Sequence, residues 1–188
     1  MTSKPVVIVL AAGKGERFLA SGGKTHKLAA SLVGTTVLQR VIRAVEESGL
    51  DLHVVKHSPG SGGMADSIAA GVSATPQAAG WLILPGDLPM IQPQSLRLVA
   101  NGLLLHKVVV PHYRQQQGHP VAFRHECFAA LSALSGDTGA KAVVQKYRLV
   151  KEVFDLVLDD AGLVTDIDTV DDLRQAEESL MRTVNPES

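Results

Sequence analysis

The sequence predicts an α/β fold in three layers, with a mostly parallel β-sheet between two layers of helices. Short, continuous apolar runs such as residues 6–10 (VVIVL) and 81–84 (WLIL) are typical of strands buried on both faces. These runs alternate with helical segments, which is the pattern of parallel strands joined by crossover helices. The chain has 188 residues, of which 45% are apolar, and this suits one α/β domain with a sizeable core. We expect a single domain over residues 1–188, with a frayed tail at 183–188.

Local signals predict the individual elements in order. After the strand at 6–10, residues 13–27 are rich in glycine and lysine and predict a loop. Thr36 can cap a helix over residues 37–47, which is apolar on one face, and Gly49 can end it. Later strands are expected at 52–55, 81–84, 107–111, 120–123 and 150–156, and later helices at 65–72, 93–104, 126–134 and 139–147. Thr169 opens a last helix, with Asp172 placed for a capping box.

Composition and charge exclude several function classes. A formal net charge of −1 argues against a protein that wraps nucleic acid. No apolar run approaches the roughly 20 residues that a membrane span needs. The single cysteine, Cys127, excludes an internal disulfide and a CxxC metal site. Because no apolar leader follows the first residues, we expect a cytoplasmic protein without nucleic-acid or membrane partners.

The stretch 13–27 (GKGERFLASGGKTHK) raises the question of phosphate binding. A P-loop that ends in Gly23-Lys24-Thr25 needs its first glycine at position 18, and a dinucleotide fingerprint that starts at Gly13 needs its third glycine there. Residue 18 is phenylalanine, so both motifs fail. Backbone N–H groups and cationic side chains still favour a phosphate site of another kind, with a solvated connecting loop as the alternative.

Two carboxylate positions are candidates for a metal site. Asp87 directly follows the run WLIL, at the strand end where ligands bind in parallel sheets, although an aspartate in a tight turn before Pro89 is the ordinary alternative. Asp166 and Asp168 alternate around an apolar residue, so in an extended chain both point to one side. Either one could complete a metal site, or Asp168 or Thr169 could simply cap the following helix.

A set of motifs then occurs in one order along the chain: LAAGKGERF, KL, TVL, PGDLP, GHPVAF, GDTGA and DIDTVDDL. The ordered set resembles the MobA-like nucleotidyltransferase family, and most of all its molybdenum cofactor cytidylyltransferases, which have LAAG where guanylyltransferases tend to have LAGG. The resemblance covers nearly the whole chain. It implies the Rossmann-like fold of the nucleotidyltransferases, of the nucleotide-diphospho-sugar transferase type.

The resemblance also implies roles for individual residues. Arg17 and Lys27 would hold the triphosphate, Asp87 would bind Mg²⁺ with Asp168 as the second carboxylate, and His119 would lie on the acceptor side. The catalytic set would be Lys27, Arg17 and Asp87. Nucleotide contacts are expected at Leu10, Ala11, Ala12, Gly13, Gly15, Lys27, Gly63, Ser67 and Asp87. Lys24 competes with Lys27 for the phosphate role, but Lys27 keeps the family's spacing to the next helix.

The implied activity is Mg²⁺-dependent transfer of CMP from CTP to a molybdopterin-type molybdenum cofactor, with release of pyrophosphate. CTP would be preferred over GTP, and a client molybdoenzyme could receive the product. One alternative is the same chemistry with GTP or on a sugar or polyol phosphate. The other is a non-catalytic, cofactor-binding maturation protein, because the chain is expected to lack about one βα unit of the family near residues 52–63.

Overall fold

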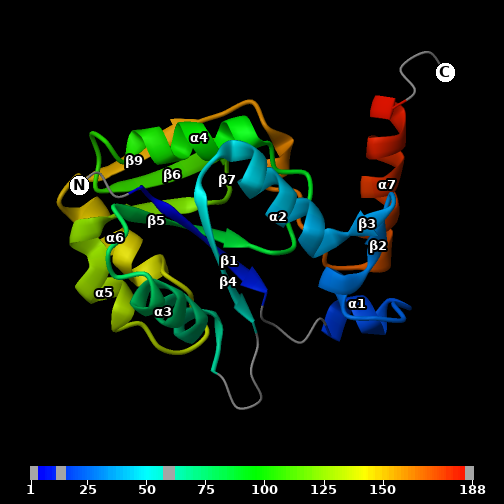
Figure 1. Ribbon diagram of the computed structural model, residues 1–188, viewed down its shortest axis with the longest axis horizontal. Coiled ribbons are helices and arrows are strands. Elements are labelled where there is room, and N and C mark those ends of the chain that lie inside the picture. The colour runs from blue at the N-terminus through cyan, green and yellow to red at the C-terminus, as the bar shows by residue number, and fades with distance from the viewer. Residues whose placement is uncertain (1–3, 12–15, 57–61, 185–188) are drawn as a thin grey trace.

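The computed structural model describes residues 4–11, 16–56 and 62–184, and it confirms the predicted α/β architecture with a mostly parallel sheet. The central sheet has seven strands in the order β4-β1-β5-β8-β6, with β7 and β9 each paired to β6 (Figure 1). β1, β4 and β5 are parallel, β9 is parallel to β6, and β8 is antiparallel to both of its neighbours. The strands are β1 (Val6–Ala11), β4 (Asp51–Lys56), β5 (Gly80–Pro85), β6 (Val108–Tyr113), β7 (Gln116–Gln117), β8 (Val121–Arg124) and β9 (Val153–Val157).

Helices cover both faces of the sheet (Figure 1). One face packs against α2 and α4, and the other packs against α3, α5 and α6. The bounds are α2 (Val37–Ser48), α3 (Met64–Ala74), α4 (Pro93–Gly102), α5 (Phe128–Ser132) and α6 (Lys141–Leu149). None of the helices in the described residues combines the length and the apolar character that crossing a membrane requires.

The first strand shows why its sequence is an unbroken apolar run. Val7 and Val9 belong to the core cluster on the α2 and α4 side, whereas Ile8 and Leu10 belong to the cluster on the α3 side. Alternate residues of a strand point to opposite faces of the sheet. Burial of both faces therefore requires apolar residues at every position of β1, as in other parallel sheets.

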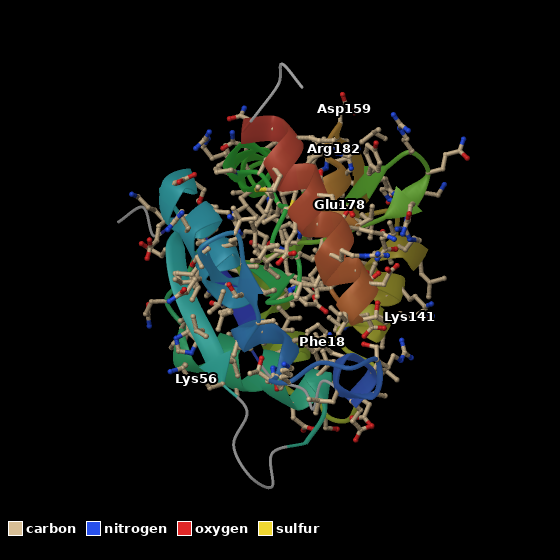
Figure 2. All side chains as sticks on the ribbon, turned by 90° about the vertical axis from the view of Figure 1, so that its right-hand side faces the viewer. Phe18, Lys56, Lys141, Asp159, Glu178 and Arg182 are labelled. Atoms are coloured by element: carbon tan, nitrogen blue, oxygen red, sulfur yellow. The ribbon has the colours of Figure 1, made fainter. Side chains whose placement is uncertain are left out.

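A third, smaller cluster lies beyond the carboxyl end of β1 (Figure 1). It is formed by α1 (Glu16–Ala20), η1 (Lys27–Ala29), the hairpin of β2 (Ser31–Leu32) and β3 (Thr35–Thr36), and α7 (Val170–Val184). Its buried side chains include Phe18, Leu32 and Ile167. Figure 2 faces this side of the molecule and shows α7 crossing its front. The cluster joins early and late parts of the chain next to the sheet. Two further 3₁₀ turns are η2 (His125–Cys127) and η3 (Ala161–Leu163).

Both predicted helix caps are confirmed, and each of them is a capping box. Thr36 Oγ1 accepts from Gln39 N at 3.1 Å, and Gln39 Oε1 accepts from Thr36 N at 3.2 Å. Gly49 ends α2 with a φ of 78°, a left-handed conformation that glycine adopts without strain. Asp172 Oδ2 accepts from Thr169 N at 2.9 Å, and Thr169 Oγ1 accepts from Asp172 N at 3.2 Å.

Several predicted boundaries are wrong for local reasons. The stretch 13–27 is not one continuous loop, because α1 and the start of η1 lie within it. β9 begins at Val153 instead of residue 150, because Lys151 has a φ of 59°, which interrupts an extended strand. α4 ends at Gly102 instead of residue 104, where the chain tightens into i→i+3 hydrogen bonds. α7 includes residues 183 and 184, and residues 185–188 of the expected tail lie outside the described residues.

Candidate active site

Asp87 follows β5 after one intervening residue, Gly86, and lies beside the end of β1. Gly86 N donates to Leu10 O at 2.9 Å, and this bond holds the turn after β5 against β1. A Cβ atom on residue 86 would lie 2.9 Å from the same oxygen, so the close approach requires glycine. Asp87 therefore sits at the carboxyl edge of the parallel strands, where ligands bind in open α/β sheets.

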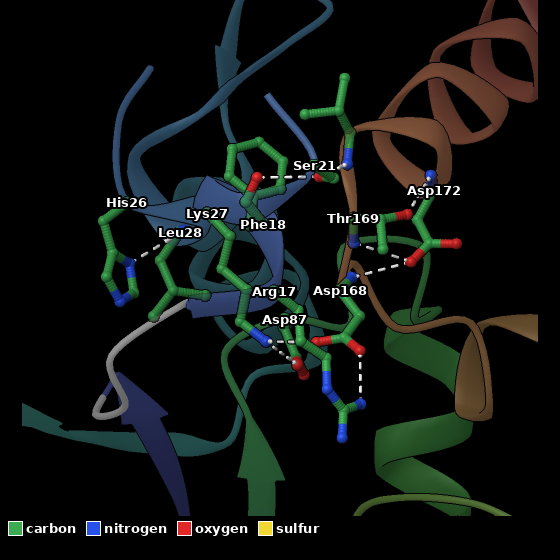
Figure 3. Close-up of polar contacts among 11 residues, drawn as sticks. Arg17, Phe18, Ser21, His26, Lys27, Leu28, Asp87, Asp168, Thr169 and Asp172 are labelled. Carbon is green, nitrogen blue, oxygen red and sulfur yellow. Dashed lines mark hydrogen bonds and ion pairs between the residues drawn. The ribbon is translucent and has the colours of Figure 1, made fainter. Parts of the chain in front are cut away.

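The segment before α7 is tied to Asp87 through the backbone. Ile167 N donates to Asp87 O at 2.9 Å, and the Ile167 side chain is fully buried. Thr169, with Asp172, forms the helix cap, so Asp168 is not needed for capping. The alternative that Asp168 or Thr169 caps the helix is therefore confirmed for Thr169 and wrong for Asp168. Its carboxylate instead meets Lys27 and Arg17 (Figure 3).

Two cations neutralise the two carboxylates (Figure 3). Lys27 Nζ lies 2.9 Å from Asp87 Oδ2 and 3.8 Å from Asp168 Oδ1. Arg17 donates to Asp168 Oδ2 at 2.8 Å. The side chains of Lys27 and Asp87 are only 17% and 18% exposed, whereas that of Arg17 is 81% exposed. The fold thus brings together the charged residues that were expected to hold the triphosphate and the metal.

The charges in the cluster act in opposite directions on Asp166 and Asp168. The Arg17 guanidinium, with a smaller contribution from Lys27, lowers the pKa of Asp168. Partial desolvation, followed by the negative charge of Asp87, raises the pKa of Asp166. Asp168 is the carboxylate that the surrounding cations hold in its charged form, which favours Asp168 over Asp166 as the partner of Asp87.

Phe18 explains how residues 16–27 are built. Its side chain is 3% exposed, and a Cβ atom on residue 23 would lie 2.4 Å from its ring, so the chain passes close to Phe18 at Gly23. Ser21 Oγ donates to Phe18 O at 2.8 Å and accepts from Val170 N at 2.9 Å, which joins the segment to the start of α7. Residues 16–27 therefore pack around the Phe18 side chain, and this packing positions the chain that leads to Lys27. Phe18 is also the residue at which both glycine motifs fail.

The packing of residues 16–27 gives Lys27 and Lys24 different environments. Lys27 begins η1, where Leu28 is 6% exposed and its N–H donates to His26 Nδ1 at 3.2 Å. The buried Leu28 side chain fixes the backbone from which Lys27 extends. Lys24 is exposed and makes no ion pair with any residue that the structure describes. The geometry supports the predicted choice of Lys27.

The expected nucleotide contacts lie in different environments. The Leu10 side chain is 6% exposed in the core and its carbonyl accepts from Gly86, so both groups are already engaged within the protein. Ala11 is half-buried at the end of β1, and Ser67 is 6% exposed within α3. The expected contacts at Ala12, Gly13 and Gly15 lie outside the described residues.

Gly63 lies where the start of α3 meets the GDTGA motif. Asp66 Oδ2 accepts from Gly63 N at 3.0 Å and from Gly136 N at 3.1 Å. A Cβ atom on residue 63 would lie 1.8 Å from Asp137 Oδ1, so the contact requires glycine. Two motifs that are far apart in the sequence therefore support each other, and a nucleotide contact at Gly63 stays a prediction.

His119 packs against η3. Its backbone N–H donates to Leu163 O at 3.0 Å. Burial lowers the pKa of His119, and the charge of Asp87 opposes this effect. Nδ1 is buried and has no hydrogen-bond partner among the described residues. Burial thus favours the neutral form of the His119 imidazole, and its place on the acceptor side stays a prediction.

Asp160 is a supporting residue that the motifs did not single out. It is 4% exposed; Oδ2 accepts from Gln92 N at 3.1 Å and Ser95 Oγ at 2.7 Å, and Oδ1 accepts from Gly162 N at 2.8 Å. Asp160 therefore joins the start of α4 to η3 and holds the chain that leads to Asp168. A glycine two residues after an aspartate is an Asx-turn signal that could have indicated this role.

We expect Asp160→Ala to lower the free energy of unfolding by about 2–4 kcal/mol, because three donors lose a charged acceptor. The matched control is Asp159→Ala, since Asp159 is exposed (Figure 2) and its removal should change the free energy of unfolding by less than about 0.5 kcal/mol. Urea unfolding of both variants measures the difference. Equal changes in the free energy of unfolding would show that the hydrogen bonds of Asp160 do not stabilise the fold.

The donor atoms of the site suit a divalent cation. Asp87 and Asp168 offer carboxylate oxygens, the ligands that Mg²⁺ and Mn²⁺ prefer, and the Lys27 ammonium already places positive charge between them. Within the described ranges, no group of three or more His, Cys, Asp or Glu side chains is arranged to hold a metal. Two carboxylates with phosphate and water oxygens are the usual composition of a Mg²⁺–nucleotide site.

Residues 46–152, more than half of the chain, match the family described as the MobA-like NTP transferase domain. The chain belongs to this family. As a MobA-like NTP transferase, its activity class is nucleotidyl transfer. The matched segment includes Asp87, whereas Arg17, Lys27 and Asp168 lie outside it and reach the site through the third cluster.

Solved structures share the fold of this MobA-like NTP transferase. Rv0371c from Mycobacterium tuberculosis H37Rv has 26% sequence identity and a TM-score of 0.75, over 95% of this chain and 100% of that chain. A complex of Rv0371c with manganese has 25% identity and a TM-score of 0.73, over 94% of this chain and 100% of that chain. The nucleotidyl transferase Mth528 from Methanothermobacter has 20% identity and a TM-score of 0.80, over 97% of this chain and 100% of that chain.

The expected absence of about one βα unit near residues 52–63 stays a prediction. In the described residues, β4 is the edge strand next to β1, and α3 and β5 are the next elements after it along the chain.

A curated Escherichia coli (strain K12) protein, the LysR family substrate binding domain-containing protein YagP, is 78% identical over 23 residues. That match spans 12% of this chain and 17% of YagP. A segment so short carries no assignment of function.

Proposed function

We propose that this MobA-like NTP transferase moves CMP from CTP to a phosphate of a molybdopterin-type molybdenum cofactor and releases pyrophosphate. The observation that carries the proposal is the cluster of Asp87, Lys27, Asp168 and Arg17 at the carboxyl edge of the sheet. The LAAG motif and the order of the other motifs support the cytidylyl branch of the family. His119 would face the acceptor, and a client molybdoenzyme would receive the product.

The chemistry requires positioning and charge neutralisation. An oxygen of the acceptor phosphate attacks the α-phosphorus of CTP, the bond from that phosphorus to the bridging oxygen of the β-phosphate breaks, and pyrophosphate leaves. The acceptor phosphate is already ionised near neutral pH, so no general base is needed. Lys27 and Arg17 would balance the negative charge that builds on the leaving phosphates.

The carboxylates would act through a metal. Asp87 and Asp168 would hold Mg²⁺, which supplies positive charge to nonbridging phosphate oxygens. The backbone bond between Ile167 and Asp87 would keep the two carboxylates at a fixed separation. Preorganised groups of this kind need little rearrangement during the reaction.

The base preference makes a separate prediction. Ala12 stands where guanylyltransferases tend to have glycine, and its methyl group would narrow the space beside the base. A tight apolar wall typically contributes about 1–3 kcal/mol of discrimination, so we expect CTP to be favoured over GTP by about 10- to 200-fold in kcat/KM. Ala12→Gly should reduce that ratio, as measured by turnover with each nucleotide. An unchanged ratio, or a wild-type preference for GTP, would remove Ala12 as the selector.

A sugar or polyol phosphate is a second candidate acceptor because of a groove of about 510 Å³ next to Asp166. Part of its lining is neutral and suits hydroxyl groups: Gln92, Thr165, Gln175 and Ser179. The charged side chains that line the rest are Asp160, Asp166, Asp172, Glu178 and Arg182.

Pyrophosphate release tests these proposals together. The assay uses each of the four nucleoside triphosphates with molybdenum cofactor, with sugar and polyol phosphates, and without an acceptor. Release that requires CTP and molybdenum cofactor supports the first proposal, and release that requires a sugar or polyol phosphate supports the second. Cofactor binding without pyrophosphate release from any nucleotide would instead indicate a non-catalytic maturation protein.

A further inference from the structure

Lys27 and Arg17 occupy the carboxylates that a metal would need. Lys27 Nζ lies 2.9 Å from Asp87 Oδ2, and Arg17 Nη1 lies 2.8 Å from Asp168 Oδ2. Each carboxylate therefore has a counter-ion in the protein alone, and Lys27 also lies 3.8 Å from Asp168. The cluster contains two positive and two negative side chains, so its formal charge is balanced without a metal.

A metal cannot simply be added to this arrangement. Mg²⁺ binds carboxylate oxygens at about 2.0–2.1 Å, so on either oxygen of Asp87 it would lie close to the Lys27 ammonium, which is 2.9 Å from Oδ2. Two cations at one partly desolvated carboxylate repel each other strongly, because Lys27 and Asp87 are only 17% and 18% exposed. Metal binding at Asp87 therefore requires Lys27 to move.

The same cations are the groups that a triphosphate would attract. Lys27 has a flexible four-carbon stem on a backbone fixed by the buried Leu28, so its ammonium can move while its Cα stays in place. The Arg17 side chain is 81% exposed, so water solvates its guanidinium whether or not it pairs with Asp168. Breaking this ion pair therefore costs little free energy. A triphosphate that binds both cations would leave Asp87 and Asp168 without counter-ions and ready for a metal.

We propose that Lys27 and Arg17 are exchangeable counter-ions that make metal and triphosphate bind as one unit. Metal alone meets two occupied carboxylates, and triphosphate alone leaves two bare carboxylates beside its own negative charge. When metal and triphosphate bind together, the carboxylates pair with the metal and the two cations pair with the triphosphate. Every charge that loses its internal partner then gains a new one. This inference rests on the proposed assignment of the cluster to a metal–triphosphate substrate.

The exchange predicts opposite effects of one substitution on the two ligands. Lys27→Met keeps an unbranched side chain one atom shorter than lysine and removes the charge. It should strengthen the binding of Mn²⁺ alone by about tenfold, and weaken the binding of a non-hydrolysable CTP analogue without metal by a similar factor. Free Mn²⁺ is counted by electron paramagnetic resonance, and the analogue is titrated by calorimetry.

Two further variants make the test specific. Lys24→Met removes a positive charge from the same segment without touching a carboxylate, so it should bind Mn²⁺ as the wild type does. Adding Asp87→Asn to Lys27→Met should abolish the gained Mn²⁺ affinity, because the gained site is the carboxylate that Lys27 released. Circular dichroism confirms that each variant is folded, and Lys27→Gln replaces Lys27→Met if the latter is not.

The outcomes separate the exchange from the function. Mn²⁺ affinity that is the same in wild type and in the Lys27 variant, with nucleotide binding weakened in the variant, overturns the exchange and leaves the proposed function intact. An equal gain in Lys24→Met also overturns it, because a general charge effect would then be sufficient. A wild-type protein that binds no CTP analogue with Mn²⁺ present overturns the proposed function itself.

Discussion

Asp87→Asn is expected to lower the metal-dependent kcat by about a hundred- to a thousandfold, which is the usual cost of losing one charge-stabilising group in a transition state. The amide keeps the shape of the side chain and removes its charge, so the backbone bond from Ile167 N to Asp87 O should persist. The measurement is pyrophosphate release at saturating CTP over a titration with Mg²⁺. Thermal unfolding checks that the variant remains folded.

The control for Asp87 is Asp166→Asn. Asp166 belongs to the segment that carries Asp168, but it forms no ion pair with Lys27 or Arg17 among the described residues. Its substitution should lower kcat by less than about tenfold, which corresponds to less than 1.4 kcal/mol. If Asp166→Asn is as severe as Asp87→Asn, the assignment of the metal ligands must be revised.

Lys27→Ala is expected to weaken the binding of the Mg²⁺–CTP complex by about ten- to a hundredfold, because a charge-assisted contact to a phosphate is typically worth about 1.5–3 kcal/mol. Lys24→Ala should weaken it by no more than about threefold, as is usual for an exposed charge without a fixed partner. Calorimetric titration with a non-hydrolysable CTP analogue compares the two. Equal losses would show that the segment 16–27 uses Lys24 as well as Lys27.

Much of the fold could be predicted because its signals are local. The apolar runs of β1 and β5, the caps at Thr36 and Thr169 and the stop at Gly49 all depend on neighbouring residues alone. The hairpin of β6 and β7 was missed because its turn lacks such a local signal. β6 and β7 are joined through Arg114 and Gln115, which have φ values of 45° and 69° although neither is a glycine or an asparagine. Two-residue hairpin turns usually contain glycine, asparagine or aspartate, so the local signal for this hairpin is absent.

The motifs predicted which charged residues the fold brings together, but not which of them form ion pairs with one another. The motifs identified Arg17, Lys27, Asp87 and Asp168, and they assigned the cations to phosphate and the carboxylates to metal. Without ligands the two sets neutralise each other, which depends on the third cluster bringing residue 17 next to residue 168. No spacing in the sequence reports this contact. Asp160 was missed because its partners at 92 and 95 belong to a different part of the chain.

The fate of the α-phosphate of CTP tests the central claim most directly. The enzyme is incubated with CTP labelled at the α-phosphate, Mg²⁺ and molybdenum cofactor, and the label and the pyrophosphate are both quantified. Our account predicts one labelled CMP group attached to the cofactor for each pyrophosphate released. Label found only in free CMP, or release of orthophosphate without a labelled acceptor, would mean that the protein hydrolyses nucleotides and would contradict nucleotidyl transfer to this acceptor.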